Sequence, residues 1–130
     1  MENSFKLIIV TPDKELYNGN VVKLNSESSD GKFGILPNHM AMVSEVIPTI
    51  ANFQDVNGKE YKCFTSSGVI KVRKNEVTIL CNAAEWPEDI DKERAQSAKK
   101  RAEDRLKNKN EIDVKRAELA LKRSLLRLNL

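Results

Sequence analysis

The sequence predicts an α+β fold in two domains: an antiparallel β-sandwich or barrel over residues 1–86, then an antiparallel two-helix hairpin over residues 87–130. Short apolar runs separated by turn residues recur as far as Cys81, a pattern typical of sandwiches and barrels. Beyond Pro87 the chain contains no Gly or Pro and consists largely of strong helix formers. One helical motif occurs twice in that segment, which predicts two similar helices.

The expected strands are six short apolar runs, at residues 7–10, 21–24, 33–36, 61–65, 69–72 and 77–81. The turn signals between them are Pro12-Asp13, Asn18-Gly19, Asp30-Gly31, Asn57-Gly58, Ser67-Gly68 and Lys74-Asn75. Asn57-Gly58 is the clearest hairpin signal, because a type I′ turn needs positive φ at both central residues.

Two helices are expected after Pro87, which suits a helix start, with Asp89 as the N-cap. The motif Ile-Asp-x-x-Arg-Ala-x-x-Ala-x-x-Arg-x-x-x-Arg-Leu begins at Ile90 and again, 22 residues later, at Ile112. A polar segment at residues 107–111 separates the two copies. Helices of ~17 residues and ~25 Å, joined by so short a loop, should pack antiparallel.

On a helical wheel each copy carries a narrow stripe of mostly small residues. The stripes are Ala95, Ala98, Ala102 and Leu106, and then Ala117, Ala120, Ser124 and Leu128. Alanine buries little surface, and each buried CH₂ contributes only ~0.8 kcal/mol, so a hairpin held by this seam should be marginal and able to open. Further leucines outside the seam need another surface, on the β domain or on a partner. They are Leu119, Leu121, Leu125 and Leu126.

Arginines edge both stripes, as Arg94, Arg101 and Arg105 and as Arg116, Arg123 and Arg127. When the stripes face each other antiparallel, an approximate twofold places both arginine rows on one face of the hairpin. Two cationic rows repel unless an anion lies between them, and guanidinium groups match phosphate oxygens well. The alternative is that these arginines are solvated or paired within their own helix, as the spacing of Asp91 and Arg94 allows.

Composition and motifs favour a binding or regulatory role over catalysis. Residues 87–130 hold 13 Lys/Arg and 9 Asp/Glu, against 9 and 10 in residues 1–86, so an acidic partner or ligand is expected at the tail. Neither a Walker A sequence nor Gly-x-Gly-x-x-Gly occurs, and the carboxylates show no acid/base pairing. His39 is the single histidine and has no nucleophile arrangement around it, so we expect a structural role. The chain is therefore predicted to be neither an enzyme nor a metal-binding protein.

Three further residues are expected to serve packing alone. Cys63 and Cys81 indicate buried strand residues in a reducing compartment, not a disulfide or metal site. Trp86 is expected to pack where the two domains meet.

The N-terminus lacks the features of a signal peptide, and the longest apolar run, residues 7–10, is far too short to span a bilayer. A soluble, intracellular protein that meets a membrane only through partners is expected.

Several motifs occur in a characteristic order. They are Val10-Thr11-Pro12-Asp13, then Gly31-x-Phe33-Gly34-Ile35-Leu36-Pro37-x-His39, then Glu76-Val77-Thr78-Ile79-Leu80 followed by Ala83-Ala84-Glu85, and finally Arg116-Ala117-Glu118-Leu119-Ala120-Leu121-Lys122-Arg123. Together they resemble the epsilon subunit of bacterial F-type ATP synthases, nearly end to end. One departure is His39-Met40-Ala41, since the family usually has Pro two residues after this histidine.

The resemblance implies a non-catalytic central-stalk subunit of a proton- or sodium-translocating ATP synthase, peripheral on the cytoplasmic face of the cell membrane. The sandwich would bind the gamma subunit and the c-ring. The hairpin would either pack on the sandwich or extend along gamma toward the catalytic alpha and beta subunits, where its basic residues meet an acidic loop of beta. The resemblance implies that the extended form would resist ATP hydrolysis. Partner contacts are expected at His39, Met40, Met42, Arg116, Lys122 and Arg123.

In some bacterial members the packed hairpin binds ATP through an Ile-Asp-x-x-Arg-Ala motif, which is intact here at residues 90–95. The resemblance then implies ATP as a regulatory ligand, with no cofactor required. Ile90 and Ala95 would line the adenine, while Glu85 and Asp91 would accept hydrogen bonds from the nucleoside. Positive charge would come from Arg94, Arg101, Arg123 and Arg127, the last three chiefly for the phosphates. The alternative is that these residues serve helix packing, as in members that bind ATP weakly or not at all.

Two other classes of function compete with this hypothesis. A nucleic-acid-binding module would use the basic hairpin and lose affinity steeply with salt. However, no aromatic residue follows Trp86 to stack a base, and the 9 acidic residues of the tail dilute its field. A free ATP-hydrolysing enzyme would need a phosphate loop or metal-binding carboxylates that the sequence lacks. We therefore expect protein partners and no nucleic acid.

Overall fold

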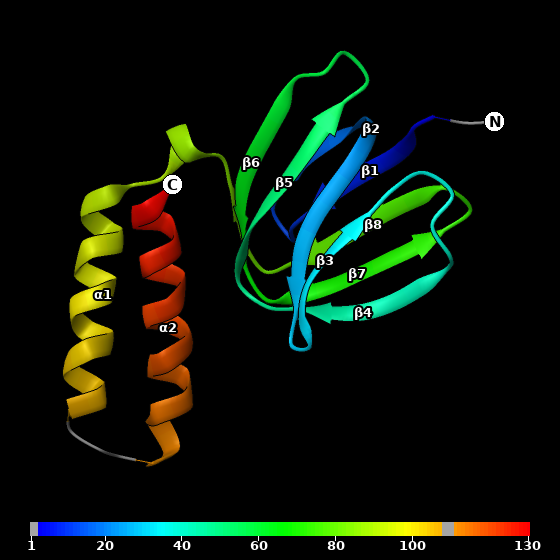
Figure 1. The fold of residues 1–130 in the computed structure, drawn as a ribbon. Coiled ribbons are helices and arrows are strands. Elements are labelled where there is room, and N and C mark those ends of the chain that lie inside the picture. The colour runs from blue at the N-terminus through cyan, green and yellow to red at the C-terminus, as the bar shows by residue number, and fades with distance from the viewer. Residues whose placement is uncertain (1–2, 108–110) are drawn as a thin grey trace.

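The computed structural model describes residues 3–107 and 111–130 (Figure 1). Within these residues nine strands precede one short 3-10 helix and two α-helices. The strands are β1 Phe5–Val10, β2 Glu15–Ser28, β3 Gly31–Ile35, β4 Met42–Val46, β5 Thr49–Asp55, β6 Glu60–Thr65, β7 Gly68–Arg73, β8 Glu76–Cys81 and β9 Ala84–Glu85. The helices are η1 Pro87–Asp89, α1 Lys92–Lys107 and α2 Glu111–Asn129.

The strands form a β-sandwich from one sheet with the order β4-β7-β8-β1-β2-β5-β6-β9, and β3 pairs with β2. The long strand β2 pairs with β1, β3 and β5 in turn, so it links the different parts of the sheet. Every pair is antiparallel except β1 and β8, which run parallel with Lys6 opposite Glu76 and Val10 opposite Leu80. The predicted antiparallel sandwich is confirmed, with this one pair as the departure.

The core follows from strict alternation along the strands, because successive side chains in a strand point to opposite faces. Phe5, Leu7 and Ile9 of β1 are at most 2% exposed, and alternate residues of β7 and β8 pack against them. Five of the six predicted runs lie wholly in strands, and the sixth, residues 33–36, extends one residue past the end of β3 at Ile35. The prediction missed β4 and β5, in which polar residues interrupt the apolar ones, and β9, which is only two residues long.

Two turn predictions were wrong in detail. Asn18-Gly19 lies inside β2, opposite Ile8 and Leu7 of β1, because ladder pairing overrides the local turn preference. At Asn57-Gly58 a hairpin does form, but only Gly58 has positive φ, at 86°. The Gly58 N–H donates to the Asp55 carbonyl at 3.2 Å, so Gly58 follows the turn and does not occupy its centre.

The type I′ geometry occurs instead between β7 and β8. Lys74 and Asn75 have φ of 48° and 61°, so both central residues are left-handed. The strand that begins this hairpin starts at Gly68, where an added Cβ would lie 2.0 Å from the Leu80 carbonyl oxygen. The close approach of β7 to β8 therefore requires glycine at this position.

Trp86, expected where the two domains meet, packs against aromatic residues of the sandwich. Its ring lies 6.4, 6.2 and 6.0 Å from the ring centroids of Tyr17, Phe53 and Tyr61, which come from β2, β5 and β6. Cys63 and Cys81 are buried free thiols in β6 and β8, which confirms them as buried strand residues.

The two helices pack antiparallel beside the sandwich (Figure 1). Their seam buries Ala95, Ala102, Ala117 and Ser124, each at most 4% exposed, as the helical wheel predicts. Asp89 is not the N-cap of α1, because Pro87–Asp89 forms η1 and the cap falls on Asp91. The predicted polar break at residues 107–111 falls largely on 108–110, outside the described residues. None of the described helices has the length and apolar character needed to cross a membrane.

Candidate functional site

A cleft of about 370 Å³ lies where the start of α1 meets the end of α2, beside β9. Both helices and the strand contribute side chains, so the cleft exists only with the hairpin packed in this arrangement. Its lining residues are Glu85, Asp89, Asp91, Arg94, Ala95, Ala98, Arg101 and Arg127.

Asp91 fixes the α1 side of the cleft by capping the helix. Its Oδ1 accepts a hydrogen bond from the Arg94 N–H at 3.0 Å, and its carbonyl accepts one from the Ala95 N–H at 3.0 Å. Arg94, Ala98 and Arg101 follow at spacings of four and three, which place them on one helix face. The Asp91–Arg94 pairing considered from the sequence is thus a backbone cap and leaves the guanidinium of Arg94 out.

Glu85 and Phe64 fix the sandwich side of the cleft. They lie opposite each other in the β6–β9 ladder, so their side chains share one face. The Ala83 N–H donates to Ser66 Oγ at 2.8 Å, which anchors the segment leading into β9. Phe64 is fully buried yet stands apart from the main sandwich core. This face of the sheet is therefore the one that the hairpin covers.

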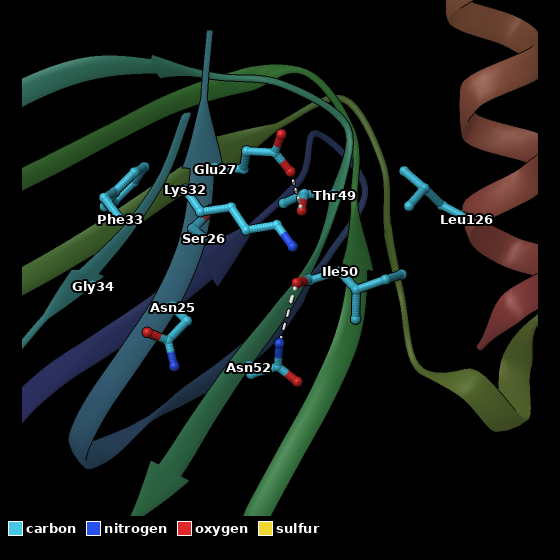
Figure 2. Close-up of a pocket in the computed structure, with 10 residues that line it drawn as sticks. All are labelled: Asn25, Ser26, Glu27, Lys32, Phe33, Gly34, Thr49, Ile50, Asn52 and Leu126. Carbon is cyan, nitrogen blue, oxygen red and sulfur yellow. Dashed lines mark hydrogen bonds between the residues drawn. The ribbon is translucent and has the colours of Figure 1, made fainter. Parts of the chain in front are cut away.

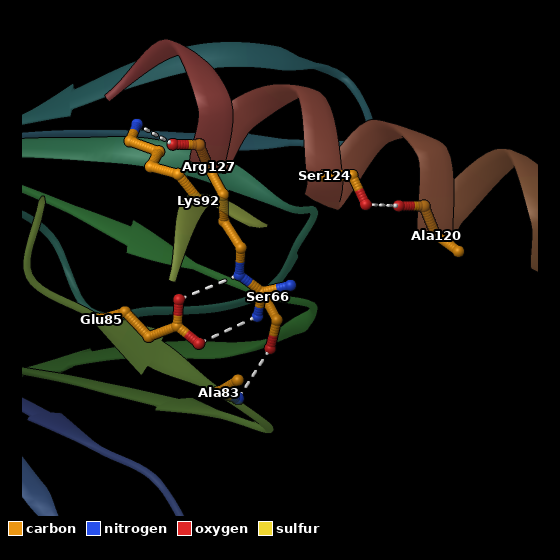
Figure 3. Close-up of polar contacts among 7 residues, drawn as sticks. All are labelled: Ser66, Ala83, Glu85, Lys92, Ala120, Ser124 and Arg127. Carbon is orange, nitrogen blue, oxygen red and sulfur yellow. Dashed lines mark hydrogen bonds and ion pairs between the residues drawn. The ribbon is translucent and has the colours of Figure 1, made fainter. Parts of the chain in front are cut away.

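Arg127 of α2 reaches across to this face (Figure 3). Its Nε donates to Glu85 Oε2 at 2.9 Å and its Nη2 donates to Glu85 Oε1 at 3.1 Å. Its guanidinium carbon lies 4.4 Å from the ring centroid of Phe64. The two charged side chains are 21% and 29% exposed, and a bidentate pair of this kind is stronger than a typical surface ion pair.

Lys92, in the first turn of α1, closes the end of the hairpin. Its Nζ donates to the carbonyls of Arg127 at 2.7 Å and Leu128 at 3.1 Å (the first is drawn in Figure 3). The last carbonyls of a helix lack partners within it and carry partial negative charge, so a cation there is favourable. Lys92 thereby ties the start of α1 to the main chain of Arg127.

The structure brings together six of the eight residues expected at a nucleotide, namely Glu85, Asp91, Arg94, Ala95, Arg101 and Arg127. Ile90 is 9% exposed and Arg123 is half-buried, and neither lines the cleft. Arginines of both helices do share the cleft, as the twofold argument expects. The side chains of Arg105, Ile112 and Asp113 lie outside the described residues.

Two of the six contact each other instead of standing apart. Glu85 was expected at the nucleoside and Arg127 at the phosphates, but the structure joins them in one ion pair. Among the described residues Arg94 and Arg101 have no carboxylate within ion-pair distance. These two guanidiniums are therefore available to bind an anion in the cleft, whereas Arg127 already holds one carboxylate on one edge. Lys92 and Phe64 had no sequence signal, because one occupies a variable motif position and the other is an ordinary strand residue.

A larger cleft, of about 620 Å³, opens between the sandwich and α2 (Figure 2). Thr49 Oγ1 donates to Glu27 Oε1 at 3.2 Å, and Ser26 Oγ is buried without a partner among the described residues. One lysine and one glutamate balance each other in charge, and no predicted site residue is present. This cleft does not match the expected anion chemistry. It is lined by Asn25, Ser26, Glu27, Lys32, Phe33, Gly34, Thr49, Ile50, Asn52 and Leu126.

The residues expected at partner contacts fall into two groups, one around His39 and one in α2. His39 Nδ1 lies 2.7 Å from the Met40 carbonyl oxygen, and Met40 is 81% exposed. Met42 lies in β4 and packs against the core, so it is less available than a loop residue would be. In α2, Arg116 is exposed and Lys122 half-buried, and neither lines the 370 Å³ cleft.

Comparisons with known proteins agree over the whole chain. Residues 4–87 match a family model described as "ATP synthase, Delta/Epsilon chain, beta-sandwich domain", and residues 88–130 match the corresponding long alpha-helix domain. An ATP synthase epsilon chain of Clostridium novyi is 50% identical over 130 residues, covering 100% of this chain and 99% of the relative. One of Clostridium kluyveri is 48% identical, covering 100% and 98%.

Solved structures show the same fold at lower identity. A chain in the Euglena gracilis mitochondrial ATP synthase matches with a TM-score of 0.84 at 22% identity, covering 96% of this chain and 79% of that chain. A chain in the central stalk and c-ring of the Tetrahymena thermophila enzyme matches with a TM-score of 0.55 at 15% identity, covering 65% and 67%.

Proposed function

Because this chain belongs to the family of bacterial ATP synthase epsilon chains, non-catalytic subunits of the F-type enzyme, we propose that its C-terminal hairpin senses ATP and thereby regulates ATP hydrolysis. The hairpin, when packed on the sandwich, holds ATP in the 370 Å³ cleft. When it extends, it inhibits hydrolysis by the catalytic head. ATP acts here as a regulatory ligand, and no cofactor is needed.

The proposed partners are the gamma subunit and the c-ring for the sandwich, and the alpha and beta subunits for the extended hairpin. The complex would lie on the cytoplasmic face of the cell membrane. Exposed apolar residues around His39 support a docking role for the sandwich, since Leu36, Met40 and Val43 are 64%, 81% and 69% exposed. Retention of the chain by immobilised gamma subunit is the direct check of that contact.

The observation that carries the ATP proposal is the convergence of Arg94, Arg101 and Arg127 from two helices on one cleft. Guanidinium groups bind phosphate oxygens through charge-assisted hydrogen bonds. Since the cleft needs both helices and β9, a ligand bound there stabilises the packed form by its differential affinity for it. The small-residue seam supports the existence of a second arrangement, because little apolar surface is lost when it opens.

The experiment that tests ATP sensing is a calorimetric titration of the full chain with ATP, with and without magnesium. Saturable binding is expected in the unmodified protein. Arg94→Ala should weaken it by at least ~10-fold, since it removes a charge-assisted contact. Arg116→Ala is the matched control, because it removes an exposed arginine that does not line the cleft, and it should bind like the unmodified chain. Absence of binding at millimolar ATP would defeat the sensing proposal and leave family membership intact.

A further inference from the structure

The contacts of Arg127 come from three separate segments of the chain. Glu85 of β9 holds its Nε and Nη2, Phe64 of β6 lies under its guanidinium, and Lys92 of α1 holds its carbonyl oxygen. We call these four residues the Arg127 clamp. The clamp joins both helices to the sandwich at one point, so it controls the place where the hairpin is attached.

The clamp uses only one edge of the guanidinium. A guanidinium offers five N–H donors in a fixed plane, and Glu85 takes the edge formed by Nε and Nη2. The remaining N–H groups of Nη1 and Nη2 can donate hydrogen bonds to two oxygen atoms of an anion. Arg127 lines the cleft alongside Arg94 and Arg101. A carboxylate on the first edge therefore orients the group for an anion on the second.

We propose that Glu85 and Lys92 are positioning residues that act through Arg127. They dock the last turn of α2 on the sandwich without any nucleotide, and they hold the guanidinium in place for phosphate. This assigns Glu85 a role different from direct contact with the nucleoside. It also gives a role to Lys92, which occupies a variable position of the Ile-Asp-x-x-Arg-Ala motif. The docking role stands independently, whereas the effect on ATP affinity rests on the function proposed above.

Hydrogen exchange of the full chain without nucleotide tests the docking role. Glu85→Gln keeps the shape of the side chain and loses its charge, and Lys92→Met keeps the length and loses the ammonium group. Backbone amides in the last turns of α2 should exchange about tenfold faster in Glu85→Gln, and faster also in Lys92→Met. The matched controls are Glu88→Gln and Lys100→Met, which remove exposed charges outside the clamp and should exchange like the unmodified chain. Unchanged exchange in Glu85→Gln overturns the proposal.

A double-mutant cycle in ATP affinity then separates positioning from direct contact. If Glu85 acts through Arg127, the losses from Glu85→Gln and Arg127→Lys should not add in the double variant. Additive losses would mean that Glu85 contacts the nucleotide itself, and they overturn the positioning role. Absence of ATP binding in the unmodified chain would defeat the function proposed above, while the exchange experiment would still decide whether the clamp docks the hairpin.

Discussion

Burial makes the two thiols of the sandwich, Cys63 and Cys81, unreactive near neutral pH. Cys63 is 0% exposed, and its burial, with a smaller effect of the nearby Cys81, raises its pKa to about 12. Burial likewise raises the pKa of Cys81, partly offset by hydrogen bonds from the backbone of Ser66 and Ala83. The thiolate is the reactive form of cysteine, so neither side chain is a nucleophile near neutral pH.

The raised pKa of Cys63 predicts a loss of stability in alkaline solution. The unfolded thiol ionises near pH 9, whereas the folded one stays protonated up to about pH 12, so the folded state binds the extra proton. The free energy of unfolding should therefore be fully retained below pH 9 and fall as the pH rises toward 12. Urea unfolding across this range measures the slope. Cys63→Ala should reduce that slope, and an equal slope in the variant would contradict the assignment.

For single residues, the sequence predicts which ones line the 370 Å³ cleft better than it predicts the contacts that each one makes. Asp91, Arg94, Ala95 and Arg101 line one cleft because the motif spacing and helix periodicity place them together at the start of α1. Glu85 is expected there only from the resemblance to the family. Their individual contacts depend on a long-range register, Glu85 opposite Phe64, that no local pattern contains. The sequence predicts Asp89 as the helix cap, whereas Asp91 takes that role because a 3-10 turn delays the start of the helix.

The helical hairpin depends on a seam of small residues. Ala102 and Ala117 are 2% and 1% exposed, so the two helix backbones approach closely there. The Ser124 hydroxyl donates to the Ala120 carbonyl at 3.0 Å, so the one polar seam residue is satisfied within its own helix. The backbones of α1 and α2 approach closely at the seam but bury little apolar surface there. The contact is therefore specific in shape, but it contributes little stabilising free energy.

Ala102→Leu should force the helices apart. The larger side chain has no space in the seam, and overpacking of this kind costs about 1–3 kcal/mol. Hydrogen exchange of α1 and α2 amides should show reduced protection, with little change in the strands. Gln96→Leu places the same side chain at an exposed position of α1 and serves as the control. Equal protection in the two variants would show that the seam is not closely packed.

Among the elements, sequence patterns identify the helices and the contiguous apolar strands. The strands β4 and β5 were missed, because residues such as Thr49, Ala51 and Phe53 alternate with partners of mixed polarity and form no run. The sequence predicts a type I′ turn at Asn57-Gly58, whereas Lys74-Asn75 adopts it. Strand twist and register decide which tight turn forms, and these depend on the paired strands.

At the scale of the whole molecule, the sandwich has a core that does not include the hairpin. The aromatic residues around Trp86 come from β2, β5 and β6, and the buried core residues all precede η1. The hairpin adds the cover over Phe64 and the ion pair to Glu85. Opening of the hairpin should thus leave the sandwich and Trp86 unchanged.

A chain ending at Asp89 should fold on its own. Its Trp86 fluorescence and near-ultraviolet circular dichroism should match those of the full chain, because the ring contacts remain. Its urea unfolding should stay cooperative, with the midpoint lowered by the loss of cover over Phe64. A chain ending at Ala83 lacks β9 and Trp86 and serves as the comparison. An emission spectrum of the Asp89 fragment that is already that of an unfolded chain would contradict the independence of the sandwich.

The parallel pairing of β1 with β8 has a consequence for the folding of the protein during its translation. Lys6 pairs opposite Glu76. One edge of β1, the first strand to be synthesised, therefore stays unpaired until β8, nearly the last strand, is available. Ribosomes add ~5–20 residues per second, so β1 spends several seconds without this neighbour. The sandwich closes only after residue 81 has emerged, and the helices, which follow it in the chain, emerge later still. The hairpin therefore emerges from the ribosome after all the sandwich strands, and it folds by docking onto the surface that they form.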